Sequence, residues 1–208
     1  MSFKEYFSKQ AENPSGIFGR LVMARIFDNG NTSLNNFMKK ELLLQGKEHI
    51  LEIGFGTGKL INELAESMNE GVIEGVDISS TMVSIAKRKN KKNIRNGKVI
   101  LKEGNFDEVP YNENSFDIVY TVNTIYFWTE PEKTLSKIFK ILKPKGMLLI
   151  AFEDEVEIKK KSLSKEIFRC YLIDEIMKLL IKAGFAENIK VISKTENNII
   201  YHCAVAVK

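Results

Sequence analysis

The feature that most constrains this chain is a repeated alternation of short apolar runs with segments whose apolar residues recur at helical spacing. The strand-like runs occupy residues 49–53, 72–78, 98–104, 116–123 and 146–153. They are almost continuously apolar, which is typical of strands buried on both faces of a parallel sheet. Because parallel neighbours are joined by right-handed crossover helices, the pattern predicts a three-layer α/β fold around a mostly parallel sheet.

Helical segments separate these strands. Residues 58–68, 81–92 and 130–142 carry the helical period. Residues 164–185 predict one or two further helices that end at Gly184. Two β-prone runs within residues 188–208 flank Asn197 and Asn198, and asparagine at a tight turn predicts a hairpin. The hairpin would add one antiparallel strand to the sheet.

Length and composition predict a single domain that spans residues 1–208. With 208 residues and 44% hydrophobic content, the chain is long enough for one buried core and short for two. We expect residues 48–208 to form the core, and residues 1–47 to form a helical lid over the carboxyl edge of the sheet. Within this lid, residues 31–44 place apolar side chains at helical spacing.

Composition also excludes several classes of protein. The longest apolar runs are far too short to span a bilayer, and the first residues lack the apolar stretch of a secretory signal. Cys170 and Cys203 lie far apart without a Cys–His cluster, which predicts reduced thiols, a cytoplasmic location and no metal site. Lys plus Arg exceed Asp plus Glu only by 31 to 27, so the charge requires no nucleic-acid partner.

Three glycines separate the first predicted strand from the helix that follows it. Gly54, Gly56 and Gly58 stand where ligands bind in such sheets, and Glu52 lies inside the strand itself. Glycines at this place let the backbone approach a ligand of the nucleotide type, while helix N–H groups face it. The dinucleotide fingerprint G-x-G-x-x-G fails because Lys59 replaces its third glycine, and no P-loop pattern fits these positions.

Four stretches in this order resemble a known family. They are LEIGFGTGKL (51–60), VDIS (76–79), GNFDEVPYNENSFDIVYTVNTIYFW (104–128) and PEKTLSKIFKILKPKGMLLIAF (131–152). They are similar to the class I S-adenosylmethionine-dependent methyltransferases, in particular the small-molecule branch with the ubiquinone and menaquinone biosynthesis enzymes, methyltransferase type 11. The resemblance covers nearly the whole chain. It implies a Rossmann-like sheet, the cofactor S-adenosyl-L-methionine and methyl transfer to a small-molecule acceptor.

The resemblance also implies which residues hold the cofactor. The glycine loop would pack on the methionine and ribose, with Glu52 near the amino-acid end or organising the loop. Asp77 would accept both ribose hydroxyls, unless it serves only as a capping acid for the helix that begins near Ser80. Ile78 and Phe106 would sandwich the adenine. The full implied set is Glu52, Gly54, Phe55, Gly56, Gly58, Asp77, Ile78, Asn105, Phe106 and Asn123.

Two departures from the family pattern bear on the chemistry. Asn105 replaces the usual aspartate, and its amide oxygen can still accept a hydrogen bond from the adenine amino group. The stretch VNTIYFW (122–128) lacks the histidine that several relatives carry, so a histidine base is unsupported. We therefore expect in-line displacement that relies on positioning. Asn123, Tyr126 and Trp128 are the candidates for positioning the acceptor, although the two aromatic residues could equally be packing residues.

The aromatic head of the chain suggests how the site closes. Phe3, Tyr6, Phe7 and Phe18 precede the sheet and need a surface to cover. They are expected to close over its carboxyl edge together with Tyr126 and Trp128. The resulting pocket would suit a small acceptor that contains a ring. The competing interpretation is that these side chains pack only beneath the head helices.

Three other functions compete with a small-molecule methyltransferase. A nucleic-acid methyltransferase is suggested by the basic run at residues 87–98, which we expect at the amino-terminal edge of the sheet as a solvated surface. The exocyclic-amine motif [DN]-P-P-[YFW] is absent from residues 120–128. A non-catalytic protein that binds the cofactor is the second alternative. NAD binding is the third, disfavoured by Lys59 and the hairpin; the acceptor atom and the oligomeric state stay open.

Overall fold

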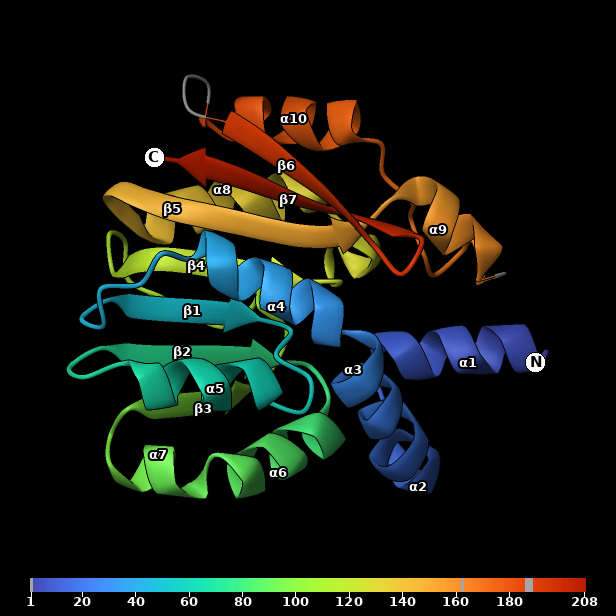
Figure 1. Cartoon of the computed structure of the whole chain (residues 1–208), viewed down its shortest axis with the longest axis horizontal. Helices are drawn as coiled ribbons and strands as arrows, with labels where there is room; N and C mark the ends of the chain where they lie inside the picture. The colour runs from blue at the N-terminus through green and yellow to red at the C-terminus, as the bar shows by residue number, and fades with distance from the viewer. Residues whose placement is uncertain (1, 162, 186–188) are drawn as a thin grey trace.

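The described residues build one seven-stranded sheet. The computed structural model describes residues 2–161, 163–185 and 189–208, and its strands run in the order β3-β2-β1-β4-β5-β7-β6 (Figure 1). The strands are β1 His49–Ile53, β2 Val72–Asp77, β3 Val99–Glu103, β4 Phe116–Val122, β5 Leu142–Glu153, β6 Ile189–Glu196 and β7 Ile199–Val207. Strands β1 to β5 pair in parallel, whereas β7 pairs antiparallel with β5 and β6. The predicted sheet with one antiparallel strand is therefore confirmed; residue 188 of the predicted hairpin lies outside the described residues.

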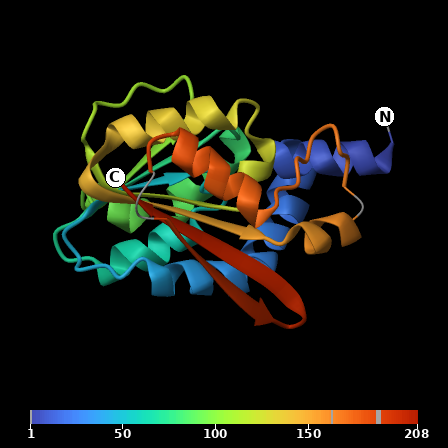
Figure 2. The same ribbon diagram turned by 90° about the horizontal axis from the view of Figure 1, so that it is seen from above.

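Helices cover both faces of this sheet (Figure 2). Those that follow β1 are α5 Lys59–Ser67, α6 Ser80–Lys89, α7 Lys91–Arg95, α8 Pro131–Ile141, α9 Glu155–Lys160 and α10 Ile173–Lys182. Helices α8 and α10 pack on one face, and α5 and α6 pack on the other. The predicted three-layer arrangement is thus confirmed. Within the described residues, no helix combines the length and the apolar character that a bilayer span requires.

The central strands are apolar on both faces, which explains why their sequences show little alternation. In β1, Leu51 and Ile53 join the core beneath α8 and α10, whereas Ile50 joins the core beneath α5. In β4, Val119 joins the core beneath α8 and α10, and Tyr120 joins the core beneath α5. The buried sheet holds the carboxyl ends of β1, β2 and β4 side by side, and the loops that follow these ends build the site.

The head, residues 2–47, differs in part from the expected lid. Its helices are α1 Phe3–Glu12, α2 Gly16–Phe18, a π-helical turn Gly19–Met23, α3 Ala24–Gly30 and α4 Thr32–Glu41. Helices α1 to α3 lie at the carboxyl ends of the strands (Figure 1). Helix α4 instead buries Leu34, Phe37 and Met38 on the face of the sheet beside α5, so the expectation that the whole head covers the edge is wrong for α4. Its apolar stripe packs there against β4 and β5.

The segment after β5 differs in part from the one or two helices predicted over residues 164–185. Helix α10 begins only at Ile173, and the chain before it forms turns across the carboxyl edge. The Ser164 N–H donates to Ser8 Oγ at 3.0 Å, and the Arg169 N–H donates to the carbonyl oxygen of Tyr126 at 3.0 Å. These bonds to distant partners bring the segment against α1 and the turn after β4, while a single local turn remains, with the Phe168 N–H donating to the Ser164 carbonyl oxygen at 2.8 Å.

Candidate active site

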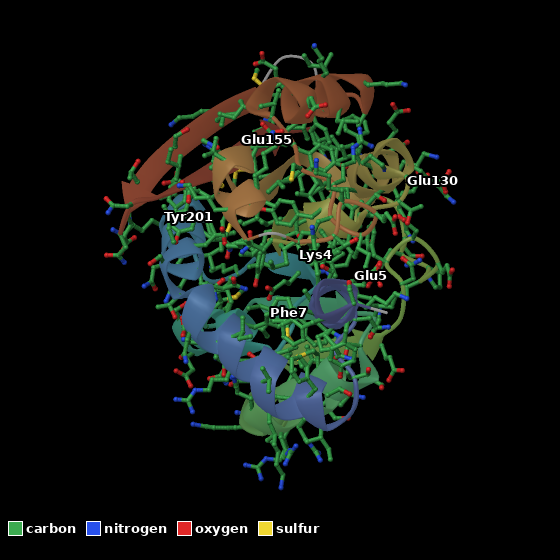
Figure 3. All side chains as sticks on the ribbon, turned by 90° about the vertical axis from the view of Figure 1, so that its right-hand side faces the viewer. Lys4, Glu5, Phe7, Glu130, Glu155 and Tyr201 are labelled. Atoms are coloured by element: carbon green, nitrogen blue, oxygen red, sulfur yellow. The ribbon has the colours of Figure 1, made fainter. Side chains whose placement is uncertain are left out.

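A cavity of about 670 Å³ lies at the carboxyl edge of the sheet. Its walls come from the loop after β1, the ends of β2 and β4, the loop after β3, the head, and the segment from α9 to residue 168. Figure 3 looks onto this end of the molecule and shows Phe7 of α1 near its middle. The volume is that of a typical small-molecule site, and most of the lining side chains are apolar.

The glycine loop needs glycine for its backbone and for its packing. Gly54, Gly56 and Gly58 all have positive φ angles, of 73°, 53° and 68°. A β-carbon at Gly54 would lie 2.3 Å from Thr124 Cγ2, and one at Gly58 would lie 2.7 Å from Ala86 Cβ. The positive φ angles let the loop turn sharply from β1 into α5, and the lack of a β-carbon lets it pack against Thr124 and Ala86, so that its backbone lines the cavity.

Asp77 holds this loop in place from the end of β2. Its Oδ2 accepts the Gly56 N–H at 2.7 Å, and its Oδ1 accepts the Ser79 N–H at 2.9 Å. Burial raises the pKa of the Asp77 carboxyl to about 6, although both backbone donors act to lower it. The N-cap of α6 is Ser79, whose Oγ accepts the Met82 N–H. Asp77 therefore organises the backbone around the cap, and each carboxylate oxygen keeps capacity to accept a ligand hydroxyl.

Glu52 is a buried acid that faces the cavity. Its side chain is in the register position opposite Tyr120 of β4, and the Tyr120 hydroxyl donates to Glu52 Oε2 at 2.7 Å. Burial raises the pKa of the Glu52 carboxyl to about 8; the tyrosine bond lowers it and nearby Asp77 raises it. At neutral pH the group is therefore largely protonated, and a cation placed beside it would favour the carboxylate.

The stability of the ligand-free protein should reflect this buried acid. Because the folded pKa of Glu52 is raised from 4.5 to about 8, the folded state keeps a proton that the unfolded state releases. Stability therefore falls as pH rises from about 4.5 to 8, and Asp77 adds the same trend between 3.8 and about 6. In Glu52→Gln, whose amide oxygen can still accept from Tyr120, we expect the melting temperature to fall ~5 °C less over this range.

Thermal melts of both proteins across this pH range measure the difference. Glu66→Gln, which changes an exposed acid on α5, is the matched control and should follow the wild type. Parallel curves for wild type and Glu52→Gln would contradict the assignment of a proton to Glu52.

At the adenine end proposed from the sequence, the cavity brings together Ile78, Asn105 and Phe106. Ile78 is 49% exposed and Phe106 is buried. The Asn105 Oδ1 accepts the Asp107 N–H at 3.1 Å, so the amide already shapes its own turn. Asp107 lines the cavity as well, and its Oδ2 accepts from Thr134 Oγ1.

Asn123 connects the end of β4 to the head. It adopts a positive φ of 57°, which asparagine tolerates better than most residues. Its Nδ2 donates to Asn31 Oδ1 at 3.0 Å, and its Oδ1 accepts from the Tyr126 hydroxyl at 3.1 Å. The side chain therefore both lines the cavity and fixes the junction of α3 and α4 above it.

The two aromatic candidates after β4 have different surroundings. Tyr126 is buried, and its hydroxyl accepts the Glu153 N–H at 2.7 Å; burial raises its pKa well above the ordinary value. Its phenol thus supports the turn, and its ring stacks on Phe168 with 5.9 Å between centroids. Trp128 is half-buried and contributes to the cavity wall. Tyr126 therefore both packs in the core and lines the cavity. The sequence had left open which of these roles it has.

The expected aromatic lid needs correction. Of the four head residues, only Phe7 is among the cavity-lining residues. Phe3 is 76% exposed, because the first turn of α1 projects beyond the edge of the sheet (Figure 1). Tyr6 and Phe18 pack on each other, with centroids 5.3 Å apart. The apolar head residues that line the cavity are Phe7, Ala11, Pro14, Met23, Ile26 and Phe27, and the polar side chains of Glu12, Asp28, Asn31 and Asn35 line it as well.

An ionic cluster ties α3 to the glycine loop. The Asp28 carboxylate accepts from Thr57 Oγ1 and pairs with Lys89 Nζ at 3.0 Å. Lys59 Nζ donates to the Asp28 carbonyl oxygen at 2.9 Å. Asp28 gave no recognisable signal in the sequence, because all three of its partners lie outside the head.

An ion pair at the cavity, between Glu153 and Lys161, was also not identified from the sequence. Glu153 ends β5, is buried and lines the cavity. Lys161, which follows α9, places Nζ 2.7 Å from Glu153 Oε1 and 2.6 Å from Oε2. An acid at the carboxyl end of a strand, as at Asp77, was the signal that could have revealed Glu153.

The two histidines lie away from this cavity, in hydrogen-bonded positions. The His49 ring contacts the Ser115 carbonyl oxygen at 3.0 Å and Glu74 Oε1 at 2.9 Å. The His202 ring contacts Ser193 Oγ and Asp154 Oδ2. In the described part of the chain, no three His, Cys, Asp or Glu side chains gather as metal ligands.

Comparison with known proteins points to one group of enzymes. A family model described as "Methyltransferase domain" matches residues 51–150. The uncharacterized methyltransferase YdaC of Bacillus subtilis is 26% identical over 179 residues, which cover 86% of this chain and 93% of that protein. The ubiquinone/menaquinone biosynthesis C-methyltransferase UbiE of Wigglesworthia glossinidia brevipalpis is 36% identical over 106 residues, covering 50% of this chain and 42% of the relative.

A solved structure agrees in fold. Phosphoethanolamine N-methyltransferase 2 of Haemonchus contortus, in complex with S-adenosyl-L-methionine, superposes with a TM-score of 0.78 at 21% identity. The match covers 100% of this chain and 60% of that one.

Proposed function

The chain belongs to the S-adenosylmethionine-dependent methyltransferases, and from that premise we propose that it methylates a small molecule held in the outer part of its cavity. The observation that carries the proposal is the cavity itself. One side is built by the glycine loop, Glu52 and Asp77, and the other by the head and the turn after β4. A site with two such walls can hold a cofactor and a second small molecule together.

The residues present fit the cofactor. Asp77 and Glu52 are two buried carboxyl groups that line the cavity, and they suit hydroxyl and cationic groups respectively. We assign the cofactor site to the residues implied by the resemblance: Glu52, Gly54, Phe55, Gly56, Gly58, Asp77, Ile78, Asn105, Phe106 and Asn123. All of these except Gly58 are among the lining residues. Gly58 supports the loop because it packs so closely on Ala86 that a β-carbon would not fit.

Positioning is the contribution we assign to the protein. When bound, S-adenosylmethionine supplies a methyl group on a sulfonium that is already strongly electrophilic. Phe7, Phe27 and Trp128 contribute apolar walls that exclude water and limit how an acceptor can lie. Orientation of this kind supplies up to ~7–11 kcal/mol in model reactions, so no histidine base is invoked. Asn123 and Tyr126 act as positioning residues, since their hydrogen bonds hold the wall in place.

The acceptor wall also contains a polar anchor. Glu153 and Lys161 form an ion pair at the cavity, whereas the residues around them are largely apolar, including Ile158, Leu163 and Phe168. This combination suits an acceptor with an apolar body and one polar group. The similarity to a ubiquinone/menaquinone biosynthesis C-methyltransferase supports a small-molecule acceptor, although the match covers less than half of that relative.

An assay of methyl transfer tests the proposal. The protein is incubated with S-adenosylmethionine and a panel of quinols, phenols, amines and thiols, and S-adenosylhomocysteine is measured. We expect turnover with at least one small acceptor. Methylation of RNA or protein with none of the panel turning over would instead support a macromolecular substrate, and tight S-adenosylhomocysteine binding without any transfer would support a non-catalytic role.

A further inference from the structure

The helical segment formed by α2, the π-helical turn and α3 is apolar on two sides. Its inner side contributes Met23 and Phe27 to the cavity. Its outer side exposes Ile17, at 79%, and Leu21, at 65%, one helical turn apart. Val22, which follows Leu21 in the same turn, is also exposed. A surface helix ordinarily has a polar outer face, so these side chains indicate a surface that meets an apolar phase.

Basic residues lie on this segment, between the acids Glu12 and Asp28. Arg20 and Arg25 are exposed on the same segment, and residues 13–27 contain no acid. Helix α6 borders the segment, because Gly16, Ile17 and Arg20 line a shallow surface depression together with Ser80, Thr81 and Ser84. The side chains beside Ile17 are therefore basic or neutral.

The basic run of the sequence continues the same surface. Lys87 and Arg88 follow Ser84 at i+3 and i+4, so they lie one turn farther along the side of α6 that borders Arg20. Both are exposed, and they begin the run 87–98, which contains no acid. We define the basic-apolar face as Ile17, Arg20, Leu21, Arg25, Lys87 and Arg88.

We propose that the basic-apolar face binds the surface of an anionic lipid bilayer. Helices that lie in a membrane interface combine exposed aliphatic side chains with Lys and Arg, and their binding adds apolar burial to attraction by acidic headgroups. A nucleic acid would satisfy the arginines and lysines but would leave Ile17 and Leu21 in water. Charge complementarity and aliphatic exposure together therefore favour lipid.

This inference goes beyond the proposed function and does not depend on it. Because Met23 and Phe27 line the cavity from the other side of the same helical segment, a bilayer on the outer face lies next to the site. An amphipathic acceptor could then reach the cavity by a short path from the membrane.

Vesicle binding by the full-length protein tests the proposal. Sedimentation is measured with vesicles of phosphatidylcholine alone and with vesicles of equal parts phosphatidylcholine and phosphatidylglycerol. We expect binding to the anionic vesicles that weakens as salt is added. Arg20→Ser/Arg25→Ser should weaken it about 30-fold, which corresponds to ~1 kcal/mol for each charge. Ile17→Ser/Leu21→Ser should weaken it about tenfold or more.

Matched controls come from the opposite edge of the molecule. Lys178 and Ile181 are exposed on α10, which lies far from α2 and α6 in Figure 1. Lys145 of β5 and Leu43, between α4 and β1, are exposed as well. Lys145→Ser/Lys178→Ser and Leu43→Ser/Ile181→Ser change the same kinds of side chain and should leave vesicle binding unchanged. Every variant should bind S-adenosylhomocysteine as the wild type does, which shows that it is folded.

Several results would overturn the proposal. The first is equal binding to neutral and anionic vesicles, or equal losses in the control variants. The second is binding of RNA that depends on Arg20 and Arg25 without vesicle binding. The third is a dimer in solution that Ile17→Ser/Leu21→Ser dissociates, again without vesicle binding. None of these results bears on whether the enzyme methylates a small molecule.

Discussion

Replacing Asp77 by alanine is expected to weaken S-adenosylhomocysteine binding about a hundredfold or more. In the proposed cofactor site this change would remove two charge-assisted hydrogen bonds to hydroxyl groups, and each such bond contributes ~1.5–3 kcal/mol. The same change releases the Gly56 and Ser79 N–H groups, so the loop that would hold the ligand also loses its anchor. Both effects act on binding in the same direction.

The stability of Asp77→Ala should change far less than its affinity. The variant loses two backbone hydrogen bonds, but it also removes a buried carboxylate whose pKa is raised by burial. Calorimetric titration and thermal melts measure the two quantities on one preparation. Asp117→Ala is the control, because Asp117 likewise accepts a backbone N–H, from His49, but lies at the amino-terminal edge. Unchanged affinity in a folded Asp77→Ala protein would restrict Asp77 to its structural role.

Deletion of residues 1–18 is expected to abolish methyl transfer to any small acceptor while cofactor affinity falls only a few-fold. The deletion removes Phe7, Ala11 and Pro14 from the wall of the cavity. It also breaks the bond from Ser79 Oγ to the Pro14 carbonyl oxygen and the bond from the Ser164 N–H to Ser8 Oγ. The acceptor side thus opens to water, whereas the glycine loop keeps its anchor at Asp77.

A matched pair of point variants separates closure from general destabilisation. Phe7→Ala opens the wall, and Phe3→Ala alters an exposed phenylalanine on the same helix, one turn away. We expect Phe7→Ala to lower kcat/KM at least tenfold, as for the loss of a positioning contact, and Phe3→Ala to leave it unchanged. A truncated protein that stays folded and turns over normally would refute the lid.

The strands and the glycine loop were predictable because their signals are local. Continuous apolar runs predict buried parallel strands, and Asn197 and Asn198 predict the tight turn of the hairpin, where both residues adopt positive φ. Asp77 ends a predicted strand, and the family resemblance implied its role at the site. Each of these features depends on a few neighbouring residues, so a pattern in the sequence records it.

Only the tertiary structure showed which residues line the acceptor side of the cavity. Helix α4 has the same helical period whether it covers the edge or the face, and only the surface available decided between them. The aromatic head shows the same limit, since Phe3 and Phe7 are alike in type and spacing, yet only Phe7 reaches the cavity.

The sequence by itself therefore determined the sheet, its order of elements and the cofactor loop, because periodicity and glycine placement are properties of short segments. The tertiary structure decided which groups meet across the cavity. Asn31 bonds to Asn123 at a separation of 92 residues, and Ser8 bonds to Ser164 at a separation of 156. Contacts at such separations depend on how the whole sheet brings its loops to one edge, and no local pattern encodes them.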